Sequence, residues 1–281
     1  IGGGIYMKPI SISEKMMFNT VRLVSSDGSS GTGYFYNFNI DDAIVPVIIT
    51  NKHVVNYKQD ETMTFYLHLL NGENESNENC KVTITTNWIF HSSKDLCFCF
   101  VNPVFEFVKK QTGKNVFYIA IDETILPTQK MLEELSALEE LVMVGYPIGL
   151  WDEKNNFPIF RKGYTAAHPA IDFNEKGIGL VDMACFPGSS GSPIYVLNEG
   201  GYKDKMGNLN WGSGRIIFIG TLFSGPIYDA TGKIVVTNIP TSQQVAESHT
   251  GIMANLGYYI KSNEIMEFKK VVKEFLDIEK F

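Results

Sequence analysis

The segment Gly188-Ser189-Ser190-Gly191-Ser192-Pro193 places small residues directly before an expected strand. Residues this small allow the backbone to fold tightly around one exposed hydroxyl, and Ser190 is the candidate nucleophile. A serine hydroxyl is a weak nucleophile unless a neighbouring base takes its proton and a third group orients that base. For Ser190 to act as a nucleophile, other parts of the chain must therefore supply a base and an acid.

A histidine and an aspartate stand at the ends of two other expected strands. His53 is the third residue after the apolar run 44–50, and Asp95 directly precedes the run 96–101. An imidazole can serve as the base, and a carboxylate can orient it. The order along the chain is His53, Asp95, Ser190. These three residues predict acyl transfer by a catalytic triad.

A scaffold rich in strands is expected to position these residues. Short runs of β-branched and aromatic residues alternate with polar or glycine-containing stretches, which is typical of a sandwich or barrel. The expected strands are 15–25, 31–39, 44–50, 63–70, 81–86 and 96–101, then 116–121, 141–144, 163–167, 177–183, 193–197, 215–223, 233–237 and 253–260. Leucines at helical spacing predict one or two helical turns in 129–141, and Ser262 is expected to cap a helix over 263–280.

Six segments resemble, in the same order, the trypsin-like (chymotrypsin-fold) serine proteases, and most closely the catalytic domain of the high-temperature-requirement (HtrA) family. The resemblance spans about residues 20–265. The six segments are GTGYF at 31–35, TNKHVV at 50–55, DL at 95–96, GYPIG at 145–149, DMACFPGSSGSP at 182–193 and GYYIKSN at 257–263.

The resemblance implies an all-β fold of two six-stranded antiparallel barrels, with the active site between them and a C-terminal α-helix. Residues 1–14 are expected to form an N-terminal extension that is in part not native. Residues 15–110 would form the N-terminal barrel, 111–261 the C-terminal barrel and 262–281 the helix. HtrA proteins continue into PDZ domains, whereas this chain is expected to have none.

The resemblance also implies a serine endopeptidase mechanism that proceeds through an acyl-enzyme. Ser190 would attack the peptide carbonyl, His53 would transfer the proton, and Asp95 would orient the imidazole. The backbone N–H groups of Gly188 and Ser190 would form the oxyanion hole.

A substrate pocket is implied by the same resemblance, and its expected lining residues are Ala184, Thr221, Leu222 and Phe223. Enzymes of this family that cut after Lys or Arg carry an aspartate at the position of Ala184. The uncharged residue favours a small or apolar side chain before the scissile bond. Val54 and Ser189 also depart from the secreted digestive members, which have a disulfide cysteine and an aspartate at these positions.

Composition excludes several other classes of protein. The 281 residues carry 24 basic and 31 acidic side chains, a net charge of −7, which disfavours nucleic-acid binding. No apolar run approaches the roughly 18 residues that span a bilayer. Four cysteines are too few for a disulfide scaffold, so we expect reduced thiols, a cytoplasmic location and neither cofactor nor metal. The expected partner is a polypeptide substrate. The sequence identifies no regulatory partner and no oligomeric state.

Two alternatives remain. An α/β-hydrolase would use the order serine, acid, histidine, with His249 as the base, but Ser192 replaces the second glycine of its motif. A protease-fold module could instead bind peptides or partners without cutting them, although its triad is intact. We expect no catalytic role for the other histidines: His68, His91, His168 and His249.

Overall fold

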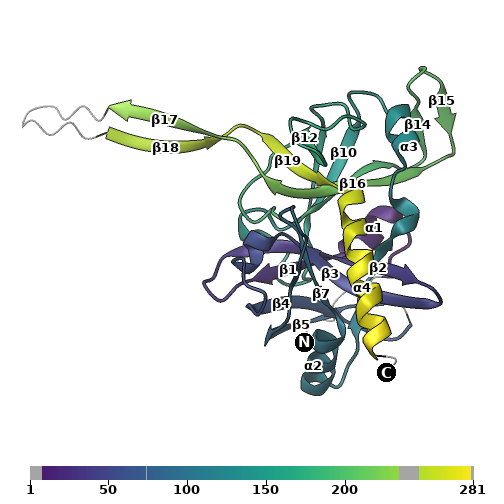
Figure 1. Cartoon of the computed structure of the whole chain (residues 1–281), viewed down its shortest axis with the longest axis vertical. Coiled ribbons are helices and arrows are strands. Elements are labelled where there is room, and N and C mark those ends of the chain that lie inside the picture. The colour runs from purple at the N-terminus through teal and green to yellow at the C-terminus, as the bar shows by residue number, and fades with distance from the viewer. Residues whose placement is uncertain (1–7, 74, 234–246, 280–281) are drawn as a thin grey trace, which may run out of the picture.

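The computed structural model describes residues 8–73, 75–233 and 247–279 (Figure 1). The first half of the chain consists of α1 (Ile12–Met17), β1 (Thr20–Val24), β2 (Ser30–Ile40), β3 (Ala43–Thr50), the 3₁₀ turn η1 (Lys52–Val55), β4 (Thr62–Leu69), β5 (Glu78–Thr85), β6 (Ile89–Phe90), β7 (Cys97–Phe100), α2 (Asn102–Thr112), β8 (Val116–Phe117), β9 (Ile121–Asp122) and the 3₁₀ turn η2 (Glu123–Ile125).

The second half contains α3 (Gln129–Glu134), β10 (Glu140–Gly145), the 3₁₀ turn η3 (Pro147–Gly149), β11 (Ile159–Thr165), β12 (Ile178–Asp182), β13 (Pro193–Asn198), β14 (Gly201–Lys203), β15 (Leu209–Trp211), β16 (Arg215–Ser224), β17 (Ile227–Lys233), β18 (Glu247–Met253), β19 (Leu256–Lys261), the 3₁₀ turn η4 (Ser262–Ile265) and α4 (Met266–Glu279). The predicted mostly-β class with a C-terminal helix is confirmed.

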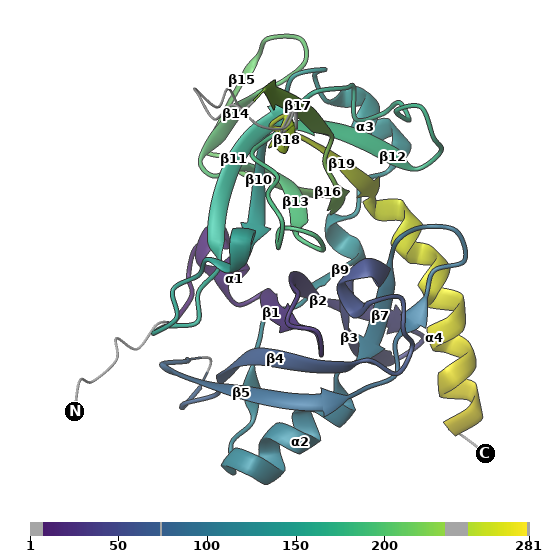
Figure 2. The same cartoon turned by 90° about the vertical axis from the view of Figure 1, so that its left-hand side faces the viewer.

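The strands form one closed barrel and a second, larger sheet, which lie one above the other in Figure 2. The barrel contains β10, β11, β12, β19, β16 and β13 in that order. The other sheet runs β5-β4-β1-β2-β3-β7-β6, with β8 beside β4 and β9 beside β2. Within the described residues no ladder joins β5 to β6. The predicted second closed barrel therefore stays a prediction.

A shared core joins the two halves. Aromatic residues of β2 and of the barrel strands belong to one buried cluster. Within it, the Tyr34 hydroxyl lies 2.8 Å from Thr221 Oγ1, and the Tyr195 hydroxyl donates to Asn19 Oδ1 at 2.9 Å. Burying a polar group costs free energy unless it is hydrogen-bonded, so these pairs favour one position of one half on the other.

The C-terminal helix α4 covers both halves along one side (Figures 1 and 2). Phe268 and Val272, on its inner face, lie fully within the shared core. The Phe268 ring packs edge-on against Phe98 of β7 at 4.9 Å. The apolar stripe predicted for this helix is thus its packing face.

Several expected elements differ from those of the structure. Residues 15–17 belong to α1, because Ser11 and Glu14 form a capping box that starts a helix there. Residues 102–112, between the expected strands 96–101 and 116–121, form α2 with a proline in its first turn. The C-terminal α-helix begins at Met266, after the 3₁₀ turn that contains Ser262. The expected strand 233–237 lies, apart from Lys233, outside the described residues.

The long hairpin of β17 and β18 projects away from the body of the molecule (Figure 1). The four cysteines, Cys80, Cys97, Cys99 and Cys185, form no disulfide in the structure. In the part of the chain that the structure describes, no helix combines the length and the apolar character needed to cross a membrane.

Candidate active site

The register of β3 against β7 brings His53 to Asp95. Thr50 pairs with Cys97 in this antiparallel ladder, so the residues after β3 lie opposite those before β7. Asn51 strengthens the join, because its side-chain amide donates to the Asp95 carbonyl at 2.7 Å. Two segments distant in sequence thus meet at the same end of the sheet.

The carboxylate of Asp95 contacts both the ring and the backbone of His53. His53 Nδ1 lies 2.6 Å from Asp95 Oδ2, and the His53 backbone N–H donates to Oδ1 at 3.2 Å. An ionised carboxylate only accepts hydrogen bonds, so Nδ1 carries a proton and Nε2 of the neutral ring is the acceptor. The side chains are 32% and 20% exposed, so the pair is open to solvent and to a substrate.

The backbone of Ser190 is bonded to the same end of the N-terminal sheet. The amide of Thr32, in β2, donates to the Ser190 carbonyl at 2.8 Å. The Thr32 carbonyl accepts from Thr50 Oγ1, at the end of β3, at 2.7 Å. Gly191 passes so close to Thr32 that a Cβ there would lie 1.9 Å from the Thr32 carbonyl oxygen. The structure therefore holds the Ser190 segment against the strand end from which His53 follows.

Burial distinguishes Ser190 from its two serine neighbours. Ser189 and Ser192 are fully buried, and their hydroxyls have no hydrogen-bond partner among the described residues. Ser190 is half-buried and keeps exposed surface. Of the three serines in this segment, only Ser190 can present its hydroxyl to a substrate.

The residues before Ser190 form a type II turn. Ser189 N–H donates to the Phe186 carbonyl at 3.0 Å, Pro187 occupies the second position, and Gly188 has a φ of +86°. This turn type favours proline at its second position and requires a positive φ at the third, which glycine adopts without steric cost. The sequence Phe-Pro-Gly-Ser thus determines the turn that carries the Gly188 amide.

Space around Gly188 is closed on one side. A Cβ on Gly188 would lie 2.6 Å from the Tyr146 carbonyl oxygen. The amides of Gly188 and Ser190 donate no hydrogen bond to any described residue. Both N–H groups are therefore free to donate to a substrate oxygen, as the donors of an oxyanion site must be.

Thr32 connects this turn to the barrel, a role that sequence reasoning missed. Its hydroxyl donates to the Gly188 carbonyl at 3.1 Å and accepts from the Tyr146 N–H at 3.1 Å. The G-T-G segment that contains Thr32 was recognisable as a motif, but its polar side chain gave no signal of its own.

The four residues expected to line a pocket face different surroundings. Thr221 is fully buried and bonded to Tyr34, and Leu222 lies in the apolar interior of the barrel. Ala184 is half-buried. Phe223 lines a surface pocket of about 290 Å³ together with Phe173 and Tyr258. The backbone of Leu222 is bonded to the Ser190 segment, because its carbonyl accepts from the Gly191 N–H at 2.8 Å.

His91, expected to have no catalytic role, organises the loop that carries Asp95. Its Nδ1 accepts from the Ser93 and Lys94 amides at 3.2 and 3.0 Å, and its Nε2 lies 3.2 Å from the Glu264 carbonyl. Burial lowers the pKa of His91, partly offset by Glu267 and Glu264. A neutral ring with a proton on Nε2 satisfies all these contacts. The η4 turn, which contains Glu264, thereby contacts the loop that carries Asp95.

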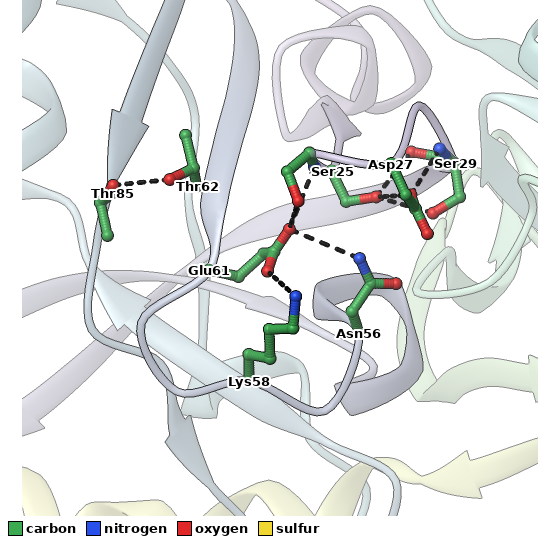
Figure 3. Close-up of polar contacts among 9 residues, drawn as sticks. Ser25, Asp27, Ser29, Asn56, Lys58, Glu61, Thr62 and Thr85 are labelled. Carbon is green, nitrogen blue, oxygen red and sulfur yellow. Dashed lines mark hydrogen bonds and ion pairs between the residues drawn. The ribbon is translucent and has the colours of Figure 1, made fainter.

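A polar cluster fixes the loop that follows His53 (Figure 3). Glu61 is 2% exposed, and its carboxylate accepts from the Ser26 amide at 3.0 Å and from the Ser26 hydroxyl at 2.5 Å. Lys58 Nζ lies 3.4 Å from the other carboxylate oxygen. These hydrogen bonds, chiefly that from the Ser26 hydroxyl, lower the pKa of Glu61. The cluster ties the β1–β2 turn to the segment after η1.

Similarity between this chain and known proteins is found among solved structures. No protein-family model and no curated protein matches the chain. Solved structures that match include an inactivated protease paralogue of the scabies mite, with 10% identity, a TM-score of 0.46 and coverage of 92% of this chain and 96% of that one. They also include a thermostable serine protease from an extremophilic microorganism, with 12% identity, a TM-score of 0.44 and coverage of 92% and 98%. These values place the chain in no family, so the proposals below rest on its own residues.

Proposed function

We propose that this chain is a serine endopeptidase of the trypsin-like type, similar to HtrA catalytic domains, that cleaves polypeptides through an acyl-enzyme. The observation that carries the proposal is the His53–Asp95 pair at the strand end to which Ser190 is bonded. Ser190 is also the only serine of its segment with exposed surface. Nucleophile, base and orienting acid are thus supplied by three separate segments.

In the proposed mechanism, Nε2 of His53 takes the proton from Ser190 Oγ as the oxygen attacks the peptide carbonyl. Asp95 stabilises the imidazolium that forms, and the imidazolium then protonates the leaving amine. Water repeats the sequence on the acyl-enzyme and releases the second product. The amides of Gly188 and Ser190 would stabilise the negative charge on the carbonyl oxygen in both steps.

We further propose that a small or apolar side chain precedes the scissile bond. Ala184 brings no charge to the segment that leads to Ser190. Cleavage after Lys, Arg or Glu in a peptide-library profile would contradict this preference. Cleavage dominated by Ala, Val or Leu would support it.

Labelling with a fluorophosphonate tests the proposed function, because this reagent phosphonylates only an activated serine. The purified chain should gain one adduct, which peptide mass spectrometry should locate on Ser190. The variant H53A should lose the label, whereas H168A, a half-buried histidine elsewhere in the chain, should keep it. An unlabelled wild-type protein with normal thermal unfolding would support the alternative, a protease-fold module that binds peptides without cutting them.

A further inference from the structure

Ile148 has a backbone conformation that its side chain disfavours. Its φ is 47° and its ψ is 29°, in the left-handed region. A β-branched residue in this region is a genuine outlier, and the surrounding structure must offset its strain. Glycine or asparagine would adopt the same conformation with less strain.

Packing of the Ile148 side chain does not explain this strain. The side chain is 66% exposed, and it belongs to no buried cluster. The backbone of Ile148, by contrast, makes a specific contact: its N–H donates to the Pro187 carbonyl at 2.5 Å. The strained conformation is therefore explained by the backbone hydrogen bond and not by burial of the side chain.

The Pro187 carbonyl belongs to the peptide unit that also contains the Gly188 N–H. No described peptide bond is cis, so the carbonyl and the N–H of this unit point in opposite directions. Holding the carbonyl on Ile148 therefore turns the Gly188 N–H away from the 146–149 turn. Because Gly188 has no Cβ, its backbone could otherwise let this peptide rotate into a type I turn, which would reverse the N–H.

We infer that Ile148 is a positioning residue, whose strained backbone N–H holds the Pro187–Gly188 peptide so that the Gly188 amide stays directed toward the reacting carbonyl oxygen. This role rests on the proposed function. It acts through Gly188, and the Ile148 side chain takes no part in it. The G-Y-P-I-G segment then has a defined use: it brings one amide, at Ile148, to the turn before Ser190.

The variant I148P removes this N–H and cannot adopt a φ of 47°. We expect its kcat to fall by about 10²–10³-fold, as for loss of one oxyanion donor, with KM within about threefold of wild type. A peptide aldehyde, which binds as an oxyanion-bearing adduct, should lose affinity by a similar factor, whereas a non-covalent product peptide should not. The control L150P removes the N–H of another exposed apolar residue in the same loop, which donates to the Pro147 carbonyl at 2.8 Å and makes no contact with the turn before Ser190. Its φ of −78° suits proline, and the variant should keep its activity.

The variants I148G and I148N retain the N–H and tolerate a positive φ, so kcat and KM should both remain near wild type. A raised KM with unchanged kcat in I148N would mean that the side chain binds substrate, which would overturn the inference. Wild-type kcat in I148P would also overturn it.

A crystal structure of I148P gives a readout that does not depend on activity. The inference predicts that the Pro187 carbonyl leaves its present orientation, and an unchanged peptide would contradict this. If wild-type protein fails to label with fluorophosphonate, the proposed function fails, whereas the role of Ile148 in holding this peptide is still decided by the crystal structure.

Discussion

Asp95 holds His53 at two points, because one carboxylate oxygen bonds the imidazole Nδ1 at 2.6 Å and the other bonds the His53 backbone N–H at 3.2 Å. The ring contact selects the tautomer, and the backbone contact fixes the start of η1 on the Asp95 loop. Asp95 therefore determines which nitrogen of the His53 ring is free to accept a proton. It also fixes the position of the His53 backbone, from which the ring extends.

Replacing Asp95 with asparagine should separate tautomer from position. The amide has the same shape, but its NH₂ group can donate to Nδ1 and so stabilise the tautomer that leaves Nε2 protonated. We expect D95N to lower kcat/KM at neutral pH on the order of 10⁴-fold. Thermal unfolding should shift little. The control D182N changes an exposed carboxylate at the end of β12 and should cleave substrate as the wild type does. A kcat/KM of D95N within tenfold of the wild-type value would contradict the role assigned to Asp95.

Adding a methyl group at Gly188 tests the geometry of the oxyanion turn. In G188A the new Cβ would lie 2.6 Å from the Tyr146 carbonyl oxygen, so the turn has to move. We expect kcat to fall by about 10²-fold or more, as when one oxyanion donor is lost. G28A is the matched control: Gly28 has a φ of +87°, and its Cβ would meet nothing within 4 Å. G28A should lose about 1 kcal/mol of stability and keep its kcat; equal losses of kcat in both variants would refute this explanation.

The Glu61 cluster in Figure 3 should stabilise the loop after His53. Hydrogen bonds to a charged acceptor are worth about 1.5–3 kcal/mol and neutral ones about 0.5–1.5 kcal/mol. The amide oxygen of E61Q can still accept, so this variant should lower the free energy of unfolding at pH 7 by the difference, about 1 kcal/mol. The pKa of Glu61 is lowered from 4.5, so its contribution is complete above about pH 4.5 and is lost as pH falls through the lower folded-state pKa. Urea denaturation at pH 7 and pH 3.5 should therefore show a smaller difference between E61Q and wild type at the acid pH. The exposed neighbour Asp60, as D60N, should unfold like the wild type at both.

His68 should make the fold sensitive to mild acid. It is 5% exposed between the rings of Phe18 and Phe157, and burial lowers its pKa from 6.5 to about 4. Below pH 6.5 the unfolded chain binds a proton at His68, whereas the folded chain binds this proton only below about pH 4. Stability should therefore decline over this range by about 3 kcal/mol from His68 alone. Between pH 7.5 and pH 5, the free energy of unfolding of H68F should decline less than that of the wild type. The control H168Q should decline as the wild type does. An equal decline in H68F and wild type would show that His68 is not the cause.

Patterns local in sequence predicted much of the fold. Alternation and β-branched content identified most of the strands, and an apolar stripe identified α4. The helices α1 and α2 were not predicted. The start of α1 depends on a capping box and the start of α2 on a single proline, and both signals lie beside strong strand-forming residues. The family resemblance implied the closed barrel that the structure shows in the second half of the chain. Local patterns alone did not predict it, because closure depends on which strands pair.

The candidate site was predicted where a residue type carries the chemistry, as with His53, Asp95 and Ser190. Contacts made by backbone atoms were not predictable in this way. Ile148 acts through an N–H that every residue except proline possesses, and Thr32 through a hydroxyl common in strands. The burial of Thr221 depends on Tyr34, which lies in the other half of the molecule.

Proteolysis by the pure protein tests the central claim most directly. Wild type, S190A and S189A should each be incubated with an unfolded protein substrate such as casein, and the fragments quantified by mass spectrometry. S189A alters a buried hydroxyl one residue away and controls for damage to the turn. The proposed mechanism predicts cleavage by wild type and by S189A, and a loss of at least about 10³-fold in S190A. Cleavage by S190A at the wild-type rate, or no cleavage by correctly folded wild type, would contradict it.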